Sequence, residues 1–165
     1  MIKKVLLLAA LILPMFASAQ TLKIAVIDTN QIFTALPETA EAQKTLEEYN
    51  QKYENEYKNL MTEMQKQYED FNAMPENELP AIKERKAREL QDTQKKIQDF
   101  EQLAMNDLQK KQDELMAPIM QKIRSAIESV GKEGGYSLIQ ELGSQLYFSA
   151  PVEDITPLVK SKLGL

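Results

Sequence analysis

Cysteine, histidine and tryptophan are absent from this chain of 165 residues, and glycine and proline are rare, with 5 and 7 copies. Without cysteine no disulfide can form, and without cysteine and histidine the chain lacks thiol nucleophiles, imidazole bases and the usual zinc ligands. Catalysis would depend on carboxylates, Lys, Ser or Tyr. A glycine-rich phosphate loop is also missing. We therefore predict a protein that is not an enzyme and has no cofactor or metal site.

Long apolar runs are also lacking, apart from one near the N-terminus. Lys3 and Lys4 precede an apolar stretch from Val5 to Leu13, and Ala17-Ser18-Ala19 follows. This order is typical of a secretory signal with a small-x-small cleavage site, and the apolar stretch is short for a membrane span. We predict a signal peptide over residues 1–19, cleaved near Ala19/Gln20, and an exported mature protein.

Basic residues are outnumbered in the predicted mature chain. Without Lys3 and Lys4 it has 18 basic and 25 acidic residues, a formal charge of −7. Nucleic acid binds mainly through Lys and Arg contacts to phosphate, so we do not expect it as a partner.

The middle of the chain is dominated by residues that favour helices, and from Glu38 to Met74 no Gly or Pro interrupts it. Apolar positions there are separated by 3, 4, 4, 3, 4, 4 and 3 residues: Leu46, Tyr49, Tyr53, Tyr57, Leu60, Met64, Tyr68 and Phe71. This 11-residue period predicts a nearly straight apolar stripe, against which a second helix must pack.

The second helix is predicted after a cluster of helix breakers at residues 74–80. It begins at Pro80, and its apolar positions recur every 3 or 4 residues as far as Val130. Two such helices joined by a tight reversal form an antiparallel hairpin with a first arm of about 55 Å. Pro118 lies inside the second helix, where it predicts a kink or hinge.

The two ends of the mature chain contain the predicted strands. Residues 22–28 predict a central, buried strand, and residues 136–141 and 145–150 predict two more, with Gly143-Ser144 as the hairpin turn between them. Asp154 is the expected N-cap of a closing helix. The predicted fold class is mostly α, with a long antiparallel helical hairpin on a small, oligomerising β-rich base. We assign residues 20–37 and 118–165 to an oligomerisation body and residues 38–117 to the hairpin, with its tip near 74–80.

Several segments in their joint order resemble the Skp/OmpH family of periplasmic chaperones. They are Lys23 to Phe33, Pro37-Glu38, Ala42 to Leu46, Pro118 to Ile123, Gly135 to Ile139, Leu146 to Ala150, and Asp154 to Thr156 with Val159. The resemblance implies a homotrimer whose hairpins surround a cavity and hold unfolded outer-membrane β-barrel proteins without ATP. The best-known members are basic, whereas this mature chain is acidic. We therefore assign no lipopolysaccharide site, and the sequence leaves contact with a membrane open.

Candidate site residues fall into two groups. A small body has little core of its own, so we expect strand residues to be buried between subunits: Leu22, Ile24, Val26, Tyr136, Leu138, Leu146 and Phe148. Met61 and Met105 lie beside the two apolar stripes and are the predicted client contacts. The aromatic stripe itself is interpreted as hairpin seam. The basic residues Lys83, Arg85, Lys86 and Arg88 are interleaved with Glu84 and Glu89, which favours a solvated face with ion pairs.

The predicted function is an ATP-independent periplasmic holdase that binds unfolded outer-membrane proteins and prevents their aggregation before membrane insertion. The alternative is a structural coiled-coil adaptor of the cell envelope that binds one folded partner with its hairpin.

Overall fold

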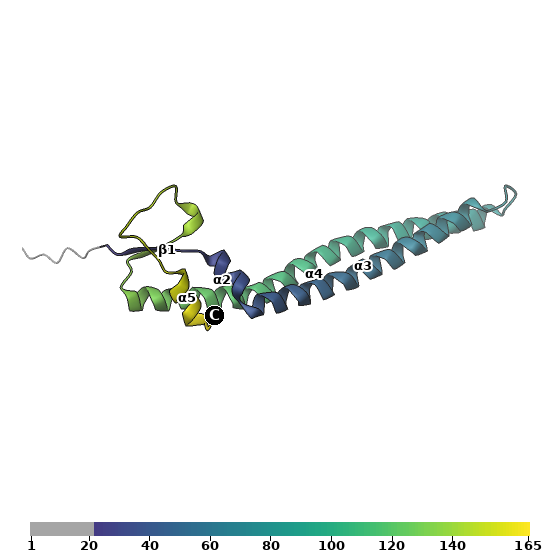
Figure 1. The fold of residues 1–165 in the computed structure, drawn as a ribbon. Helices are drawn as coiled ribbons and strands as arrows, with labels where there is room; N and C mark the ends of the chain where they lie inside the picture. Colours follow the sequence, from purple (N-terminus) through teal and green to yellow (C-terminus); the bar gives the residue numbers. More distant parts are fainter. Residues whose placement is uncertain (1–21) are drawn as a thin grey trace, which may run out of the picture. The chain divides into compact units, whose positions relative to one another are not determined.

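The computed structural model describes residues 22–165, so the predicted signal peptide and its cleavage site lie outside the described residues. Two compact units are present: a sheet body formed by residues 22–29 and 126–164, and a hairpin unit formed by residues 30–125. Helix α4, Pro80–Gly134, contributes to both units (Figure 1). The predicted fold class, mostly α with a long helical hairpin and a small sheet, is confirmed.

The sheet body contains three parallel strands in the order β2-β1-β3. They are β1 (Ile24–Ile27), β2 (Leu138–Glu141) and β3 (Glu153–Asp154), and Ile24 of β1 pairs with Leu138 of β2. The prediction that the first strand is central is confirmed. Helix α5 (Thr156–Leu163) follows β3. The core of this body contains Ala25, Val26, Ile27, Ala126, Val130, Ile155 and Val159.

The predicted hairpin between residues 136–141 and 145–150 is wrong. Leu142–Ser144 forms a short 3-10 helix, residues 145–150 form no strand, and the third strand is Glu153–Asp154. Both β2 and β3 pair in parallel with β1, one on each side of it, and a two-residue turn cannot connect parallel strands. Strand pairing therefore does not explain why residues 145–150 are apolar.

Asp154 is the predicted N-cap of α5, but the N-cap residue is Ile155, so Asp154 lies one position before it. Asp154 nevertheless stabilises the start of the helix. The Asp154 Oδ1 atom accepts hydrogen bonds from the backbone N–H of Thr156 at 2.9 Å and from its hydroxyl at 2.6 Å. The Thr156 hydroxyl in turn accepts from the backbone N–H of Asp28 at 2.9 Å. One carboxylate thus connects the end of β1 to the beginning of α5.

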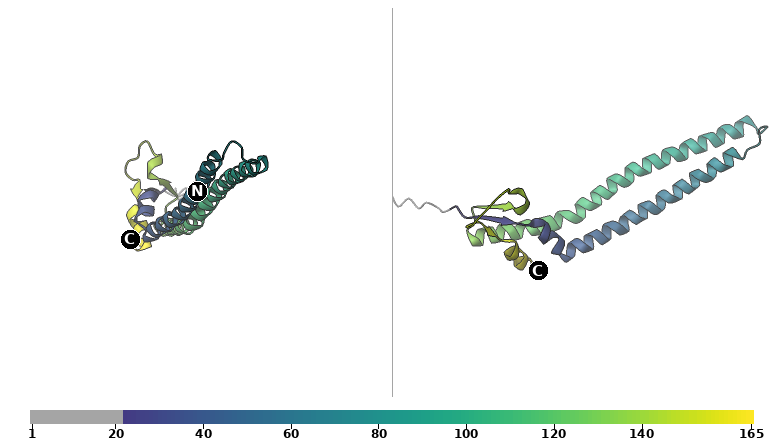
Figure 2. Two further views of the ribbon diagram at one scale, coloured as in Figure 1. Left: turned by 90° about the vertical axis from the view of Figure 1, so that its right-hand side faces the viewer. Right: turned by 45° about the horizontal axis from the view of Figure 1, so that its top comes forward.

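The hairpin unit begins with the short helix α2 (Thr29–Ala35, whose first residue belongs to the body), followed by α3 (Pro37–Asn72). Pro37 occupies the first turn of α3, where a missing N–H costs nothing. The 36 residues of α3 span about 54 Å at 1.5 Å per residue. After the turn at residues 73–79, α4 runs back beside α3 (Figures 1 and 2).

The turn and the boundaries of the helices agree with the breaker residues of the sequence. The backbone N–H of Glu78 donates to the Pro75 carbonyl at 3.0 Å, and that of Ile82 donates to the Leu79 carbonyl at 2.9 Å. Helix α4 continues through Pro118, so this proline does not end the helix. The hinge at Pro118 remains a prediction.

Gly135 directly follows α4 and has a left-handed backbone conformation. Substituting this glycine tests whether that conformation ends the helix. Its φ is 66°, and the next residue, Tyr136, donates its backbone N–H to the Gly131 carbonyl at 3.0 Å. A Cβ at Gly135 would contact nothing within 4 Å, so Gly135→Ala costs only the conformational penalty, about 1 kcal/mol. We expect this variant to lower the midpoint of thermal unfolding by several degrees in circular dichroism. Gly143→Ala is the control, because that site is also open and has no positive φ. Equal midpoints for the two variants would contradict this account of the helix stop.

Candidate functional site

The seam between α3 and α4 is closed by aromatic rings and one polar contact. The Tyr53 ring lies edge-on to Tyr49, with centroids 5.4 Å apart, and 5.8 Å from the ring of Phe100 on α4. The Tyr53 hydroxyl donates to Asp107 Oδ2 at 2.9 Å. Burial and this hydrogen bond to a carboxylate raise the pKa of Tyr53 well above its usual range. The seam therefore contains a hydrogen bond that is satisfied in one register of the two helices.

The predicted apolar stripe of α3 is buried unevenly. Leu60 is 3% exposed, and Ile97 of α4 is 7% exposed. Tyr57 and Tyr68, in contrast, retain 37% and 56% exposure. The stripe packs the seam as interpreted, but two of its tyrosines also reach the surface, because a single partner helix covers only part of each of these side chains.

An apolar groove runs along one side of the hairpin. It consists of two adjoining hollows of about 430 and 470 Å³ that share Asn50, Met105 and Leu108. Its apolar lining comes from both helices: Leu46, Tyr53, Tyr57, Phe100, Ala104, Met105 and Leu108. We call this surface the hairpin groove. Met105, one of the two predicted client contacts, lies in it and is 67% exposed.

Met61, the other predicted client contact, does not line the hairpin groove. It is 36% exposed and lies one helical turn beyond Tyr57, on the same side of α3. The sequence interpretation did not include Leu108, Ala104 or Asn50 among the contacts. Their place in the groove could have been found by pairing residues equally distant from the turn at 73–79.

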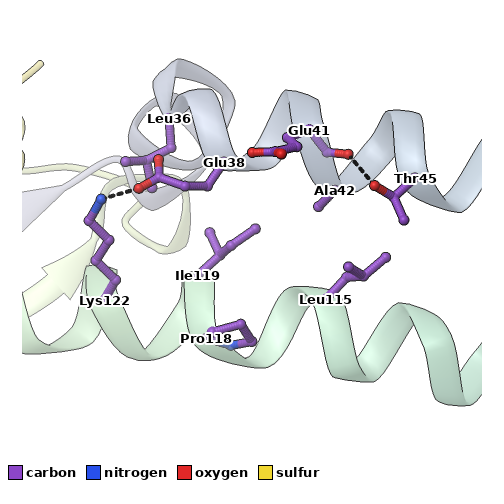
Figure 3. A pocket seen from close by; sticks show the side chains of 9 residues that line it. All are labelled: Leu36, Glu38, Glu41, Ala42, Thr45, Leu115, Pro118, Ile119 and Lys122. Atoms are coloured by element: carbon purple, nitrogen blue, oxygen red, sulfur yellow. Dashed lines mark hydrogen bonds and ion pairs between the residues drawn. The ribbon is translucent and has the colours of Figure 1, made fainter.

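A separate hollow, of about 360 Å³, lies between the beginning of α3 and the Pro118 region of α4 (Figure 3). Lys122 forms an ion pair with Glu38 across it. The hydrogen bond from Lys122 holds the pKa of the Glu38 carboxyl below its usual range. Glu38 also lies in the first turn of α3, where a negative charge is favourable to the helix dipole. This pair joins the two helices near the predicted hinge.

The sheet body has a charged cluster around Tyr136. The Lys23 ammonium lies 4.0 Å from the centre of the Tyr136 ring and donates to the Gly134 carbonyl at 3.0 Å. The Tyr136 hydroxyl donates to Glu153, and this hydrogen bond raises the pKa of Tyr136 to about 12. Lys162 contacts Glu133 at 2.5 Å and lowers the pKa of that carboxyl. These contacts connect the segments that flank the sheet.

The residues predicted to lie between subunits differ in exposure within the single chain. Val26 is 1% exposed and Ile24 and Tyr136 are half-buried, so these three side chains are covered largely by their own chain. The others are exposed: Leu22 at 66%, Leu138 and Phe148 at 43%, and Leu146 fully. Tyr147, which the sequence interpretation left out, is 83% exposed. Exposed apolar residues thus gather in residues 146–148.

Three of the four basic residues near the tip, Arg85, Lys86 and Arg88, form ion pairs as interpreted, whereas Lys83 donates to the Glu76 backbone carbonyl at 2.7 Å. Arg88 contacts Glu84 at 3.1 Å, and Lys86 contacts Glu89 at 2.6 Å and lowers the pKa of that carboxyl. Within residues 22–165, no three acidic side chains come close enough together to hold a metal ion. None of the helices in that part of the chain is both long and apolar enough to cross a membrane.

The geometry defines a class of protein with a hairpin of two long helices, a small parallel sheet and an open apolar groove. A family model described as "Outer membrane protein (OmpH-like)" matches residues 23–163. The chain belongs to this OmpH-like family, and the family predicted from the sequence is confirmed.

One curated relative and one solved structure extend the comparison. The chain is 31% identical over 151 residues to the chaperone protein Skp of Yersinia enterocolitica, a match that covers 85% of each chain. A crystal structure of a candidate outer membrane chaperone (OmpH-like) from Caulobacter crescentus CB15 matches with a TM-score of 0.72, over 85% of this chain and 82% of that one. At 15% identity, this second likeness concerns the fold alone.

The Tyr53–Asp107 hydrogen bond can be tested by removing one hydroxyl. Tyr53→Phe leaves the half-buried Asp107 carboxylate without its donor, so we expect the free energy of unfolding to fall by about 1 kcal/mol. Tyr57→Phe is the matched control, because Tyr57 is on the same stripe and more exposed. Urea denaturation followed by circular dichroism measures both. A loss for Tyr57→Phe as large as that for Tyr53→Phe would show that the hydrogen bond does not stabilise the seam.

Proposed function

We propose that this protein is an ATP-independent periplasmic holdase, which binds unfolded outer-membrane proteins and prevents their aggregation before membrane insertion. The observation that carries the proposal is the hairpin groove, an apolar surface on two helices with the side chain of Met105 exposed at its centre. Membership of the OmpH-like family and likeness to a protein named chaperone Skp support it.

The composition of the groove suits clients of varied sequence. Met is flexible and polarisable, and Met-rich surfaces adapt to different partners. Each contact made by Met105, Tyr57 or Leu108 is weak, so an extended client is retained only through many contacts at once. Release then needs no nucleotide, which agrees with the lack of ATP in the periplasm. The sequence of residues 1–19 supports export to that compartment.

The sheet body is the proposed oligomerisation region, and a homotrimer is the proposed assembly. The exposed side chains of Leu22, Leu138, Leu146 and Phe148 are large and apolar, and the body around them is small. Small domains bury too little apolar surface to be stable alone, so contacts between copies are the natural source of additional burial. In this division of roles, residues 20–37 and 118–165 assemble, and residues 38–117 hold the client.

Pro118 is the proposed hinge of the hairpin. Proline lacks an N–H and therefore removes one backbone hydrogen bond from α4. Bending there would let the hairpins adjust to clients of different size.

Holdase activity is tested by diluting a urea-unfolded β-barrel outer-membrane protein into buffer and following light scattering. With residues 20–165 of this protein present at equimolar trimer, we expect aggregation to be suppressed. Met105→Ala should raise the concentration needed for half suppression about threefold, because part of the buried thioether contact is lost. Leu103→Ala is the control, since Leu103 is 54% exposed on the hairpin but does not line the groove. Undiminished aggregation with the unmodified protein would refute the proposed function.

The oligomer is tested separately by analytical ultracentrifugation of residues 20–165. We expect a trimer at micromolar concentration, and the double substitution Leu146→Gln and Phe148→Gln should shift the mass toward monomer. Leu103→Gln, at a 54% exposed site on the hairpin, should leave the mass unchanged. A folded monomer of the unmodified chain would contradict the proposed assembly.

A further inference from the structure

The rim of the hairpin groove carries charge of one sign. Glu47, Glu54 and Glu101 line the groove, and among the residues that the structure describes no Lys or Arg does. Two of these glutamates lie on α3, which has nine acidic and four basic residues. The rim is therefore acidic around an apolar floor.

Among the described residues, none of these three carboxylates is in an ion pair with a Lys or Arg within 4.0 Å. Glu54 accepts hydrogen bonds only from neutral amides, those of Asn50 at 2.8 Å and Gln51 at 3.4 Å. In the hollow of Figure 3, by contrast, Glu38 is paired with Lys122. The groove thus leaves a negative potential open to whatever occupies it.

We infer that the hairpin groove selects unfolded segments in which apolar side chains alternate with Lys or Arg, and disfavours segments rich in Asp or Glu. This inference rests on the proposed holdase function and names the chemistry of its clients. Lys and Arg have apolar stems and charged ends, so their stems can cover the groove floor while their ends reach the rim. The exposed Tyr57 ring offers a second favourable surface for a cation.

The spacing of the rim agrees with an extended occupant. Glu47 and Glu54 are seven residues apart on α3, about 10 Å along the helix. An extended chain covers that distance in about three residues. An acidic segment at the same place would meet two or three unpaired carboxylates, and juxtaposed like charges weaken binding.

The test uses three fluorescein-labelled, unstructured 20-residue peptides with identical Leu and Phe positions. Their variable positions hold Lys in one peptide, Gln in the second and Glu in the third. Fluorescence anisotropy with residues 20–165 at 50 mM NaCl should show the Lys peptide binding about tenfold more tightly than the Glu peptide, with the Gln peptide between them. At 500 mM NaCl the difference should shrink to about twofold, because exposed charges are screened.

Two variants with the same change in net charge locate the effect. Glu47→Gln, Glu54→Gln and Glu101→Gln together should reduce the preference at 50 mM NaCl to about twofold. Glu56→Gln, Asp70→Asn and Asp92→Asn together should preserve it, because these three exposed residues lie outside the groove. Circular dichroism checks that both variants are folded.

The outcomes separate this inference from the proposed function. Equal affinity for the Lys and Glu peptides, no binding of any peptide, or an equal loss of preference in both variants would overturn the acidic selection. Suppression of β-barrel aggregation in the light-scattering assay would stand in each of those cases. Aggregation that is not suppressed in that assay would refute the holdase function. The relative affinities of the three peptides would still test whether the groove prefers Lys to Glu.

Discussion

The structure of the hairpin unit depends on one constraint: two helices can cover only one stripe of each other. Leu60 and Ile97 lie in that stripe and are almost fully buried. Side chains at the edge of that stripe or beside it, such as Tyr57 and Met105, are left partly in water. A third helix would cover them, and in a globular bundle they would belong to the core. The exposed apolar surface is therefore a direct consequence of the architecture, and contiguous surface of this kind marks an interaction site.

Polar contacts select one register of α3 against α4, which apolar contacts alone would not do. An 11-residue repeat presents similar apolar side chains at successive positions, so several registers of α3 against α4 would bury comparable area. The Tyr53 hydroxyl, however, meets Asp107 in one register, and Lys122 meets Glu38 in the same one. A shifted register would leave these groups without partners, which is costly for the half-buried Asp107. The turn at residues 73–79 reinforces the same choice.

Features that depend on local chemistry could be predicted from the sequence, and features that depend on backbone pairing could not. Pro80 begins α4 as predicted, and Pro37 and Gly135 lie at the start of α3 and just past the end of α4, because the backbone preferences of these residue types act wherever they occur. The strand Glu153–Asp154 escaped prediction, since it is two residues long, polar and held by its pairing with Ala25 and Val26. The apolar residues 146–148 were taken for a strand because apolar composition does not distinguish a sheet residue from one exposed in a loop.

The groove was predictable in part, for a related reason. Met105 could be identified from its position beside the stripe, but its neighbours come from the other helix and depend on the register of the hairpin. That register follows from the turn: Tyr53 lies 19 residues before the end of α3, and its partner Phe100 lies 20 residues after the start of α4. The acidic rim requires a further step, because the α3 and α4 glutamates become one surface only when both helices are placed. The net charge of the chain bears only on whole classes of partner, such as nucleic acids and acidic lipids. The position of the unpaired carboxylates around the groove determines which part of a bound chain would meet that negative charge.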